Sequence, residues 1–243
     1  MKLLLLAGTS EARALAGRLA DDPRVSVIAS LAGATRDPAP LPVETRIGGF
    51  GGAAAQEEFM KSNGIEVVID ATHPFASRIS HRTQAICDRL GLPWLQILRP
   101  GWQPVAGDRW RYVDDAEGAA QAIPQGAVAF AATGRQTLAA FAKRADVTLY
   151  LRQIDPPSSP FPLPTGGYVV GTPPFSIEDE MRLFKDLGVD VLVVKDAGGR
   201  AGSKLDAARA LGLPVIVIRR PGQPPGDKVA SVAEALGWLE RRL

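Results

Sequence analysis

Gly8, Thr9 and Ser10 form a short polar turn between a run of leucines and a helical pattern, in LLLLAGTSEARALAGRL at residues 3–19. A tight turn from a strand into a helix directs backbone N–H groups and the positive end of the helix dipole to one point, which favours an anion. The turn therefore predicts a site for the pyrophosphate of a dinucleotide. The complete fingerprint needs further glycines, so the alternative remains that Ser10 only caps the helix, with Glu11 stabilising its dipole.

The second apolar run, residues 25–33, is followed by Arg36 and has no acidic residue at its end. Proteins that prefer NAD usually place Asp or Glu there, where it binds the ribose hydroxyls. A guanidinium instead forms paired, charge-assisted hydrogen bonds with a phosphate. Arg36 therefore predicts recognition of the 2′-phosphate of NADP, although arginines are also common on surface loops.

A third apolar run ends in DATHPF, residues 70–75. Open parallel sheets bind ligands at the carboxyl ends of their strands. We therefore expect the following residues to lie close to the nucleotide: Asp70, Thr72, His73, Pro74 and Phe75. The imidazole of His73 could donate to a phosphate or carry a proton. The alternative is that Thr72 and His73 cap the next helix and that Pro74 begins it.

The second half of the chain contains two further turns suited to anions. The first, Thr133, Gly134 and Arg135, lies between an apolar run and a helical pattern at 135–145. The second is KDAGGRAGSK, residues 195–204, whose glycines expose backbone donors and whose cations add charge. We expect it to bind carboxylates or phosphates through Lys195, Gly198, Gly199, Arg200, Gly202 and Lys204. Its spacing is not that of a P-loop, and glycines also serve sharp turns that need a positive φ.

Short apolar runs alternate with helical patterns along most of the chain, which predicts an α/β fold of βα units with mainly parallel sheets. The first hundred residues contain four expected strands. A Pro- and Trp-rich stretch at 99–110 interrupts the pattern, so we place a domain boundary there. The sequence thus predicts two Rossmann-like domains, residues 1–100 and 101–243, with a ligand cleft between them.

The composition argues against several classes of protein. Lys and Arg total 28 against 26 for Asp and Glu, without a basic stripe, so no nucleic-acid partner is expected. The apolar runs are too short for a membrane span or a signal-peptide core. Cys87 is the only cysteine and His81 has no companion ligands, so we expect no disulfide and no metal site. The expected location is the cytoplasm.

Five stretches of the sequence together resemble the precorrin-6A reductase family of cobalamin biosynthesis. They are, in chain order, LLAGTSEARALA (5–16), DATHPFA (70–76), TGRQTL (133–138), GTPPFSIEDEMRLF (171–184) and VVKDAGGRAGSKLDAARALGLPVIVIRRP (193–221). The second and the last are the most specific. Ala7 and Ala197 depart from the glycine and serine that family members often have there, but both are small residues.

The resemblance implies an NADPH-dependent reductase that converts precorrin-6A to precorrin-6B, by adding a hydride to one ring double bond and a proton next to it. It implies that the turn at 8–10 holds the cofactor, while the loops of the second domain hold the acidic groups of the tetrapyrrole. The candidate proton donors are His73, Lys195 and Asp196. Hand-over of the product to neighbouring pathway enzymes is a further expectation.

Two alternatives remain open from the sequence. One is an NADP-dependent reductase of a smaller polycarboxylate, and the other is a module that senses a dinucleotide without turnover. The sequence also does not decide whether the macrocycle carries cobalt, or which domain the helix expected at 229–242 packs against.

Overall fold

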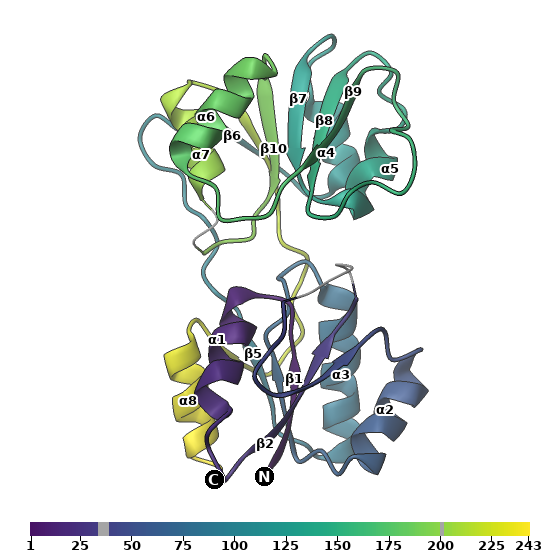
Figure 1. The fold of residues 1–243 in the computed structure, drawn as a ribbon, viewed down its shortest axis with the longest axis vertical. Helices are drawn as coiled ribbons and strands as arrows, with labels where there is room; N and C mark the ends of the chain where they lie inside the picture. Colours follow the sequence, from purple (N-terminus) through teal and green to yellow (C-terminus); the bar gives the residue numbers. More distant parts are fainter. Residues whose placement is uncertain (34–38, 200–201) are drawn as a thin grey trace. The chain divides into compact units, whose positions relative to one another are not determined.

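The computed structural model describes residues 1–33, 39–199 and 202–243, and the chain divides into two units (Figure 1). Unit 1 comprises Met1–Pro100 together with Pro221–Leu243, and unit 2 comprises Gly101–Arg220. The first division falls within the Pro- and Trp-rich stretch. The expectation that all of 101–243 forms the second domain is wrong for its last part, since residues 221–243 belong to unit 1.

Unit 1 contains one sheet of six parallel strands in the order β12-β5-β4-β1-β2-β3. Its elements are β1 (Lys2–Leu6), α1 (Ser10–Leu19), β2 (Ser26–Leu31), β3 (Glu44–Ile47), α2 (Ala53–Ser62), β4 (Val67–Asp70), α3 (Ser77–Leu90), β5 (Trp94–Ile97), β12 (Asp227–Val229) and α8 (Val232–Glu240). The order corresponds to the doubly wound arrangement of a dinucleotide-binding domain.

The leucine run of β1 is buried because helices cover both faces of the sheet. Leu3 and Leu5 belong to the core formed with α1 and α8, while Leu4 and Leu6 belong to the core formed with α2 and α3. Successive side chains of a strand point to opposite faces, so a central strand with both faces covered needs a continuous apolar run. The run therefore places β1 in the middle of the sheet.

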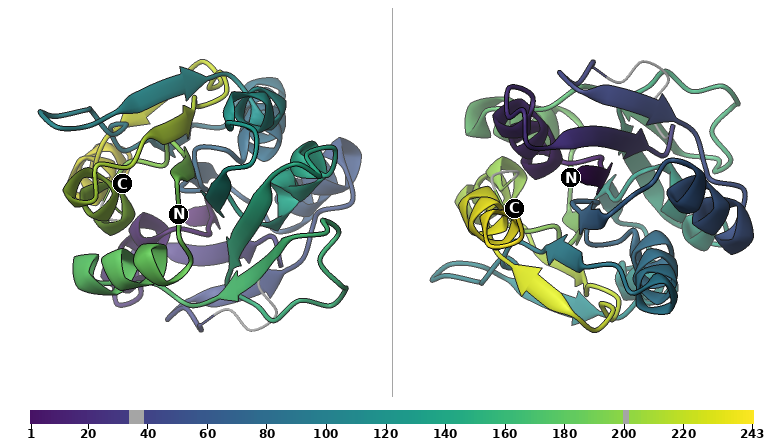
Figure 2. Two further views of the ribbon diagram at one scale, coloured as in Figure 1. Left: turned by 90° about the horizontal axis from the view of Figure 1, so that it is seen from above. Right: turned by 90° about the horizontal axis from the view of Figure 1, so that it is seen from below.

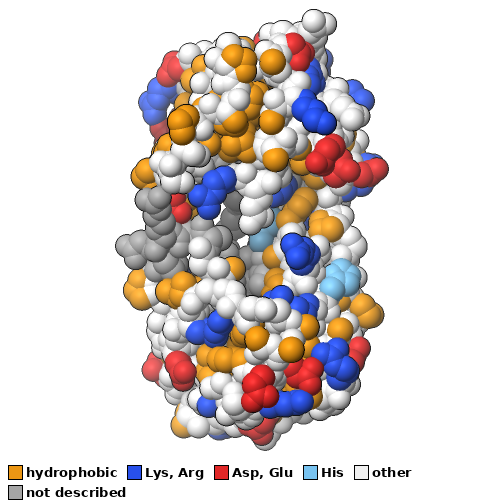
Figure 3. Space-filling view, turned by 90° about the vertical axis from the view of Figure 1, so that its right-hand side faces the viewer, with side chains coloured by type: hydrophobic (Ala, Val, Ile, Leu, Met, Phe, Trp, Pro, Cys, Tyr) orange, Lys and Arg blue, Asp and Glu red, His pale blue; other side chains and the backbone are white. Residues whose placement is uncertain are grey.

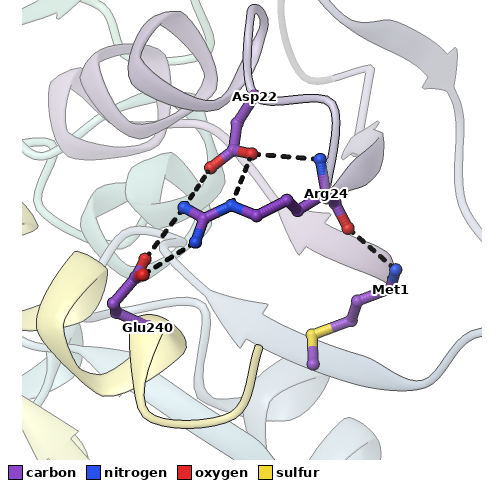
Figure 4. Close-up of polar contacts among 4 residues, drawn as sticks. All are labelled: Met1, Asp22, Arg24 and Glu240. Carbon is purple, nitrogen blue, oxygen red and sulfur yellow. Dashed lines mark hydrogen bonds and ion pairs between the residues drawn. The ribbon is translucent and has the colours of Figure 1, made fainter.

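The C-terminal segment is fastened to unit 1 by strand pairing, packing and charge. Strand β12 pairs in parallel with β5, and α8 packs against α1 (Figures 1 and 2). The Trp238 indole N–H donates to the Asp227 carboxylate at 2.7 Å. Figure 4 shows Glu240 of α8 bonded to Arg24, with nitrogen-to-oxygen distances of 2.7 and 3.0 Å. These contacts explain why 221–243 does not belong to unit 2.

Unit 2 also contains one sheet of six parallel strands, in the order β6-β11-β10-β7-β8-β9. Its elements are β6 (Trp110–Val113), α4 (Ala116–Ala122), β7 (Val128–Ala132), the 3-10 helix η1 (Arg135–Thr137), α5 (Leu138–Phe141), β8 (Thr148–Gln153), β9 (Gly166–Val170), α6 (Ile177–Asp186), β10 (Val191–Lys195), α7 (Ser203–Ala210) and β11 (Val215–Ile218). Two parallel sheets with intervening helices confirm the predicted α/β fold.

Three short strands and one helix differ from the sequence-based expectation. Strands β3, β6 and β12 each lie at an edge of a sheet and are only three or four residues long. Their side chains are mostly exposed or half-buried, so no apolar run marks them. The helix expected at 135–145 is reduced to η1 and the four-residue α5.

The surface is mixed in charge. On the face drawn in Figure 3, the basic and acidic side chains of the described residues are interspersed. No helix within the described ranges is long and apolar enough to span a membrane.

Candidate functional site

The carboxyl ends of β1 and β4 lie side by side in unit 1, and the sheet order reverses there. From β1 the chain proceeds to β2 and β3 on one side, whereas β4, β5 and β12 lie on the other. Open α/β sheets bind ligands in the crevice at such a switch point. The turn at 8–10 follows β1 and the stretch 71–76 follows β4, so the fold brings the two predicted cofactor segments together.

The hydroxyl of Thr9 links these two segments. Thr9 is the N-cap of α1: its Oγ1 accepts a hydrogen bond from the Ala12 amide at 3.2 Å and donates one to the Ala71 carbonyl at 2.7 Å. The alternative that Ser10 caps the helix is therefore wrong, and Ser10 is the first helical residue. Since the side chain of Thr9 is already engaged, its backbone remains the group suited to a phosphate.

The turn fits a phosphate in its conformation and in its exposed groups. Gly8 has φ of 142°, a conformation that residues with a Cβ rarely adopt, and both Gly8 and Ser10 are exposed. The first turn of α1 adds backbone donors and the positive end of the dipole. The conformation at this position therefore favours glycine.

The buried carboxyl of Asp70 shapes the segment that follows β4. Its Oδ1 accepts from the Thr72 amide at 3.0 Å and from the Thr72 hydroxyl at 2.7 Å. Burial raises the pKa of Asp70, although hydrogen bonds from Ser80 and Thr72 oppose this. Helix α3 begins only at Ser77, with Ala76 as N-cap, so the alternative in which Thr72 and His73 cap that helix and Pro74 begins it is wrong.

His73 and Pro74 are held by contacts from two directions. The Phe75 amide donates to His73 Nδ1 at 3.2 Å, so a neutral His73 carries its proton on Nε2. The Gln223 side chain donates to the Pro74 carbonyl at 3.0 Å and accepts from Gln96 at 2.9 Å. Sequence reasoning missed Gln223, because only the return of the C-terminal segment brings it to this edge.

An arginine that the sequence did not single out lies at the ends of β2 and β3. Arg46 donates to the Ser30 hydroxyl at 2.7 Å, and its guanidinium lies 4.0 Å from the ring centre of Phe50. Burial lowers the pKa of Arg46. The residue expected to read the 2′-phosphate, Arg36, lies outside the described residues. Arg46 therefore places a described cation beside the carboxyl end of β2.

Unit 2 has its own switch point, between β7 and β10. Thr133, Gly134 and Arg135 follow β7, and the loop 196–199 follows β10, so the fold again brings two predicted ligand segments together. The buried hydroxyl of Thr133 lies 2.6 Å from that of Thr137, which donates to the Gly134 carbonyl at 2.9 Å. The Thr133 side chain therefore stabilises its own turn.

The loop after β10 contains two glycines of positive φ and is flanked by two lysines whose pKa is lowered. Gly198 and Gly199 have φ of 64° and 69°, so both positions favour glycine. Burial lowers the pKa of both Lys195 and Lys204. The Lys204 ammonium lies 5.4 Å from the ring centre of Trp102. Of the other residues predicted in this loop, Gly202 is the N-cap of α7, and Arg200 lies outside the described residues.

A buried ion pair that the sequence did not predict lies among the elements around Lys204. Arg152 at the end of β8 contacts Glu180 of α6 through two hydrogen bonds of 2.6 and 2.7 Å. The Arg152 guanidinium also lies 4.8 Å from the ring centre of Phe130 and 4.2 Å from that of Phe175. Burial lowers the pKa of Lys204 most strongly, Arg152 lowers it as well, and Glu180 raises it.

Asp196 is engaged by two parts of unit 2. Its Oδ1 accepts from the Trp102 amide at 3.0 Å, and its backbone carbonyl accepts from Arg220 Nε at 2.8 Å. The Arg220 Nε also lies 3.6 Å from Asp196 Oδ2. Among the residues that the structure describes, no group of three or more His, Cys, Asp or Glu side chains could hold a metal ion.

Two units, each a six-stranded parallel sheet with ligand-type loops at its switch point, define a Rossmann-like α/β protein. The model of the family "Precorrin-6x reductase CbiJ/CobK" matches residues 2–240. The chain belongs to this family of reductases, as the sequence predicted.

The similarity to individual relatives extends over nearly the whole chain. The precorrin-6A reductase of Rhodococcus erythropolis is 43% identical, with 98% of this chain and 97% of that protein covered. The cobalt-precorrin-6A reductase of Priestia megaterium is 30% identical, with 98% and 97% covered. A solved structure of "CobK precorrin-6A reductase" is 41% identical, covers 99% of this chain and 96% of that chain, and has a TM-score of 0.94.

Proposed function

We propose that this protein reduces precorrin-6A to precorrin-6B with NADPH in the biosynthesis of cobalamin. The observation that carries the proposal is the similarity along the full chain to relatives with that name, at 43% identity for the Rhodococcus protein. NADPH supplies a hydride to one carbon of a ring double bond, and a proton is added to the neighbouring atom. The product therefore gains two hydrogens, and no nucleophile on the protein is needed.

In this proposal unit 1 holds the cofactor. The backbone of the turn at 8–10 binds the pyrophosphate, and the segment 72–75 lies beside it. Support comes from the position of both segments at the switch point and from the Thr9 hydrogen bond that joins them. Arg36 reads the 2′-phosphate in the proposal, and Arg46 is the alternative residue for that role.

Unit 2 binds the acidic side groups of the macrocycle in the proposal. The residues assigned to this role are Thr133, Gly134, Arg135, Lys195, Gly198, Gly199, Arg200, Gly202 and Lys204. Lys195 is also the favoured proton donor, because burial lowers its pKa and so makes its ammonium a stronger acid than that of an exposed lysine. His73 is the second candidate.

The similarity also favours a macrocycle without cobalt. Identity is 43% to the Rhodococcus relative named precorrin-6A reductase, but 30% and 25% to two relatives named cobalt-precorrin-6A reductase. We therefore propose the metal-free substrate. A cytoplasmic location and hand-over of the product to a neighbouring enzyme extend the proposal.

Incubation with NADPH and metal-free precorrin-6A tests the function directly. The expected result is a change in the visible spectrum, oxidation of NADPH and a gain of two hydrogens by mass. Faster turnover of the cobalt form would reverse the choice of substrate. If NADPH is oxidised only with a smaller polycarboxylate, the first alternative holds. If NADPH binds but is oxidised with none of these compounds, the chain is a dinucleotide sensor.

Arg36→Ala is expected to weaken NADPH binding about 10- to 100-fold and to leave NADH binding nearly unchanged, because only NADPH carries the 2′-phosphate. Titration of cofactor fluorescence measures both affinities. Arg18→Ala, which changes an exposed arginine of α1, is the matched control. Equal loss for both cofactors would contradict phosphate recognition by Arg36, and a selective loss in Arg46→Ala would assign it to Arg46.

Lys204→Ala is expected to raise the KM for the macrocycle about 10- to 100-fold and to spare NADPH affinity, because it removes one charge-assisted hydrogen bond to a carboxylate. Lys185→Ala, on the exposed side of α6, is the control. An unchanged KM in Lys204→Ala would show that this residue does not bind the substrate.

The same residue gives an expected pH dependence. Burial lowers the pKa of Lys204 from its ordinary value of 10.5, so the ammonium is lost at a lower pH than that of an exposed lysine. The KM for the macrocycle should therefore rise as the pH increases, starting below 10.5. Lys204→Arg keeps its charge throughout this range and should abolish the rise. A rise that persists in Lys204→Arg would point to Lys195 instead.

A further inference from the structure

The chain passes between the two units twice, and the same three residue types mark both passages. Residues 99–101 read Arg-Pro-Gly and lead from β5 into unit 2, and residues 220–222 read Arg-Pro-Gly and lead from β11 back into unit 1. We refer to these two segments as the crossings. Proline has no backbone N–H, so the proline of each crossing cannot donate a backbone hydrogen bond that would hold the segment in place. An arginine side chain begins each crossing, and in the second crossing the Gln223 side chain also donates to the Pro221 carbonyl at 2.7 Å.

The first crossing is fastened inside unit 1. Arg99 Nη1 lies 2.9 Å from Glu11 Oε2, and the two side chains are only 15% and 21% exposed. Glu11 lies in the first turn of α1, directly after the turn at 8–10. Burial raises the pKa of Glu11, but its backbone hydrogen bond, the charge of Arg99 and hydrogen bonds from Ser10 and Thr9 together lower it by more, so the net pKa is below the ordinary value. The pair is therefore ionised at neutral pH and connects the crossing to the proposed cofactor turn.

The second crossing is fastened inside unit 2, at Asp196. Arg220 donates to the Asp196 carbonyl at 2.8 Å and lies 3.6 Å from its carboxylate, with side-chain exposures of 15% and 17%. The same carboxylate accepts from the Trp102 amide at 3.0 Å. Asp196 thus holds Trp102, just after the first crossing, and Arg220, the first residue of the second.

Gly101 shows how closely the carboxylate fits. A Cβ at this position would lie 2.6 Å from Asp196 Oδ2, closer than a Cβ approaches another heavy atom. Any larger residue at 101 would therefore have to displace this carboxylate. The position of Asp196 at the end of β10 also places this attachment in the loop proposed to bind the macrocycle.

We propose that Arg99 and Arg220 are positioning residues that fasten the two crossings to the ligand loops of their own units, and that Asp196 is the shared anchor and not the proton donor. The expected effect of these residues on the rate of hydride transfer rests on the proposed function. The crossings are the covalent connections between the unit assigned to NADPH and the unit assigned to the macrocycle. Hydride transfer needs its two carbons near contact, and a displacement of 1 Å can cost about 100-fold in rate.

Arg220→Gln is the first test, with Arg219→Gln as its matched control. Arg219 is 55% exposed and lies 3.4 Å from Asp114, which is 90% exposed. In Arg220→Gln, hydrogen exchange at the Trp102 amide should rise about 10-fold, and kcat should fall by about 10- to 100-fold. NADPH affinity should stay within about twofold, because the cofactor turn is unaltered. Arg219→Gln should change none of these quantities.

Arg99→Gln and substitutions of Asp196 complete the test. Arg99→Gln should lower kcat to a similar extent, whereas Arg89→Gln, at a residue that is 54% exposed, should not. Asp196→Asn keeps an oxygen that accepts from the Trp102 amide but cannot supply a proton as an acid. It should therefore retain much more activity than Asp196→Ala, with an unchanged pH profile.

Equal inactivity of the Asn and Ala variants of Asp196 would overturn the proposal, and so would unchanged exchange at Trp102 in Arg220→Gln. The exchange measurement needs no substrate. If the unaltered protein fails to reduce precorrin-6A, the proposed function fails, while Trp102 exchange still decides whether Arg220 and Asp196 fasten the crossing.

Discussion

Glu180→Ala should lower the free energy of unfolding by about 3–5 kcal/mol, because it leaves the Arg152 guanidinium buried without its counter-ion. The Glu180 side chain is 1% exposed and that of Arg152 is 10% exposed. Both carboxylate oxygens accept from Arg152, at 2.6 and 2.7 Å. Urea unfolding followed by circular dichroism measures the loss.

Glu240→Ala is the matched control, since it also removes a carboxylate that binds an arginine in a two-oxygen arrangement. Glu240 and its partner Arg24 are 60% and 51% exposed, so water replaces the lost contact and the effect should be much smaller. Equal losses in the two variants would contradict the argument from burial.

Replacement of both partners distinguishes the cost of an unpaired buried charge from the influence of the pair on Lys204. In Arg152→Met with Glu180→Leu, no charge is stranded, so much of the stability lost in Glu180→Ala should return. Glu180 raises the pKa of Lys204 and Arg152 lowers it, with the contribution of Glu180 the larger. Loss of both should therefore leave a small net lowering of the Lys204 pKa, and the KM for the macrocycle should be elevated at alkaline pH. Normal KM in the double variant would show that the pair has no influence on Lys204.

Gly166→Ala should destabilise unit 2 by about 2–5 kcal/mol, through unfavourable φ and overpacking together. Gly166 begins β9 with φ of 107°, and a Cβ there would lie 1.9 Å from the Leu149 carbonyl oxygen. Leu149 is its partner in the parallel pairing with β8. The backbone of one strand must therefore move, and thermal unfolding should show a lower midpoint.

Gly167→Ala is the adjacent control. Its Cβ would have no heavy atom within 4 Å, and Gly167 does not have a positive φ. It should therefore leave stability unchanged within about 1 kcal/mol, because alanine also restricts the unfolded chain. A similar loss at both glycines would show that strand propensity, and not the clash with Leu149, sets the cost.

Much of the central architecture could be predicted from the sequence, because local patterns specify it. The leucines of β1 are buried on both faces of a sheet, so the continuous apolar run was a reliable sign of a central parallel strand. Gly8 has a conformation that needs glycine, so the turn after β1 could be recognised as well. The edge strands β3, β6 and β12 were missed, since they are only three or four residues long and none contains a buried apolar run.

The candidate site was predictable in its segments but not in its contacts. The residues of 8–10 and 70–75 follow two strands, and the rule that ligands bind at carboxyl ends was enough to group them. Local capping patterns did not identify the right residues: Thr9, and not Ser10, caps α1, and α3 starts after Ala76 while the Thr72 hydroxyl donates to Asp70.

The sequence by itself determined the family, through the resemblance of five stretches along the chain. It also determined the two parallel sheets and the segments at each switch point, because short-range periodicity and glycine positions encode these. Only the tertiary structure decided that residues 221–243 return to unit 1 and that Glu180 pairs with Arg152. It also decided that Asp196 receives both Trp102 and Arg220. These contacts join residues distant along the chain, and their energies depend on burial and exact distance, which no local pattern contains.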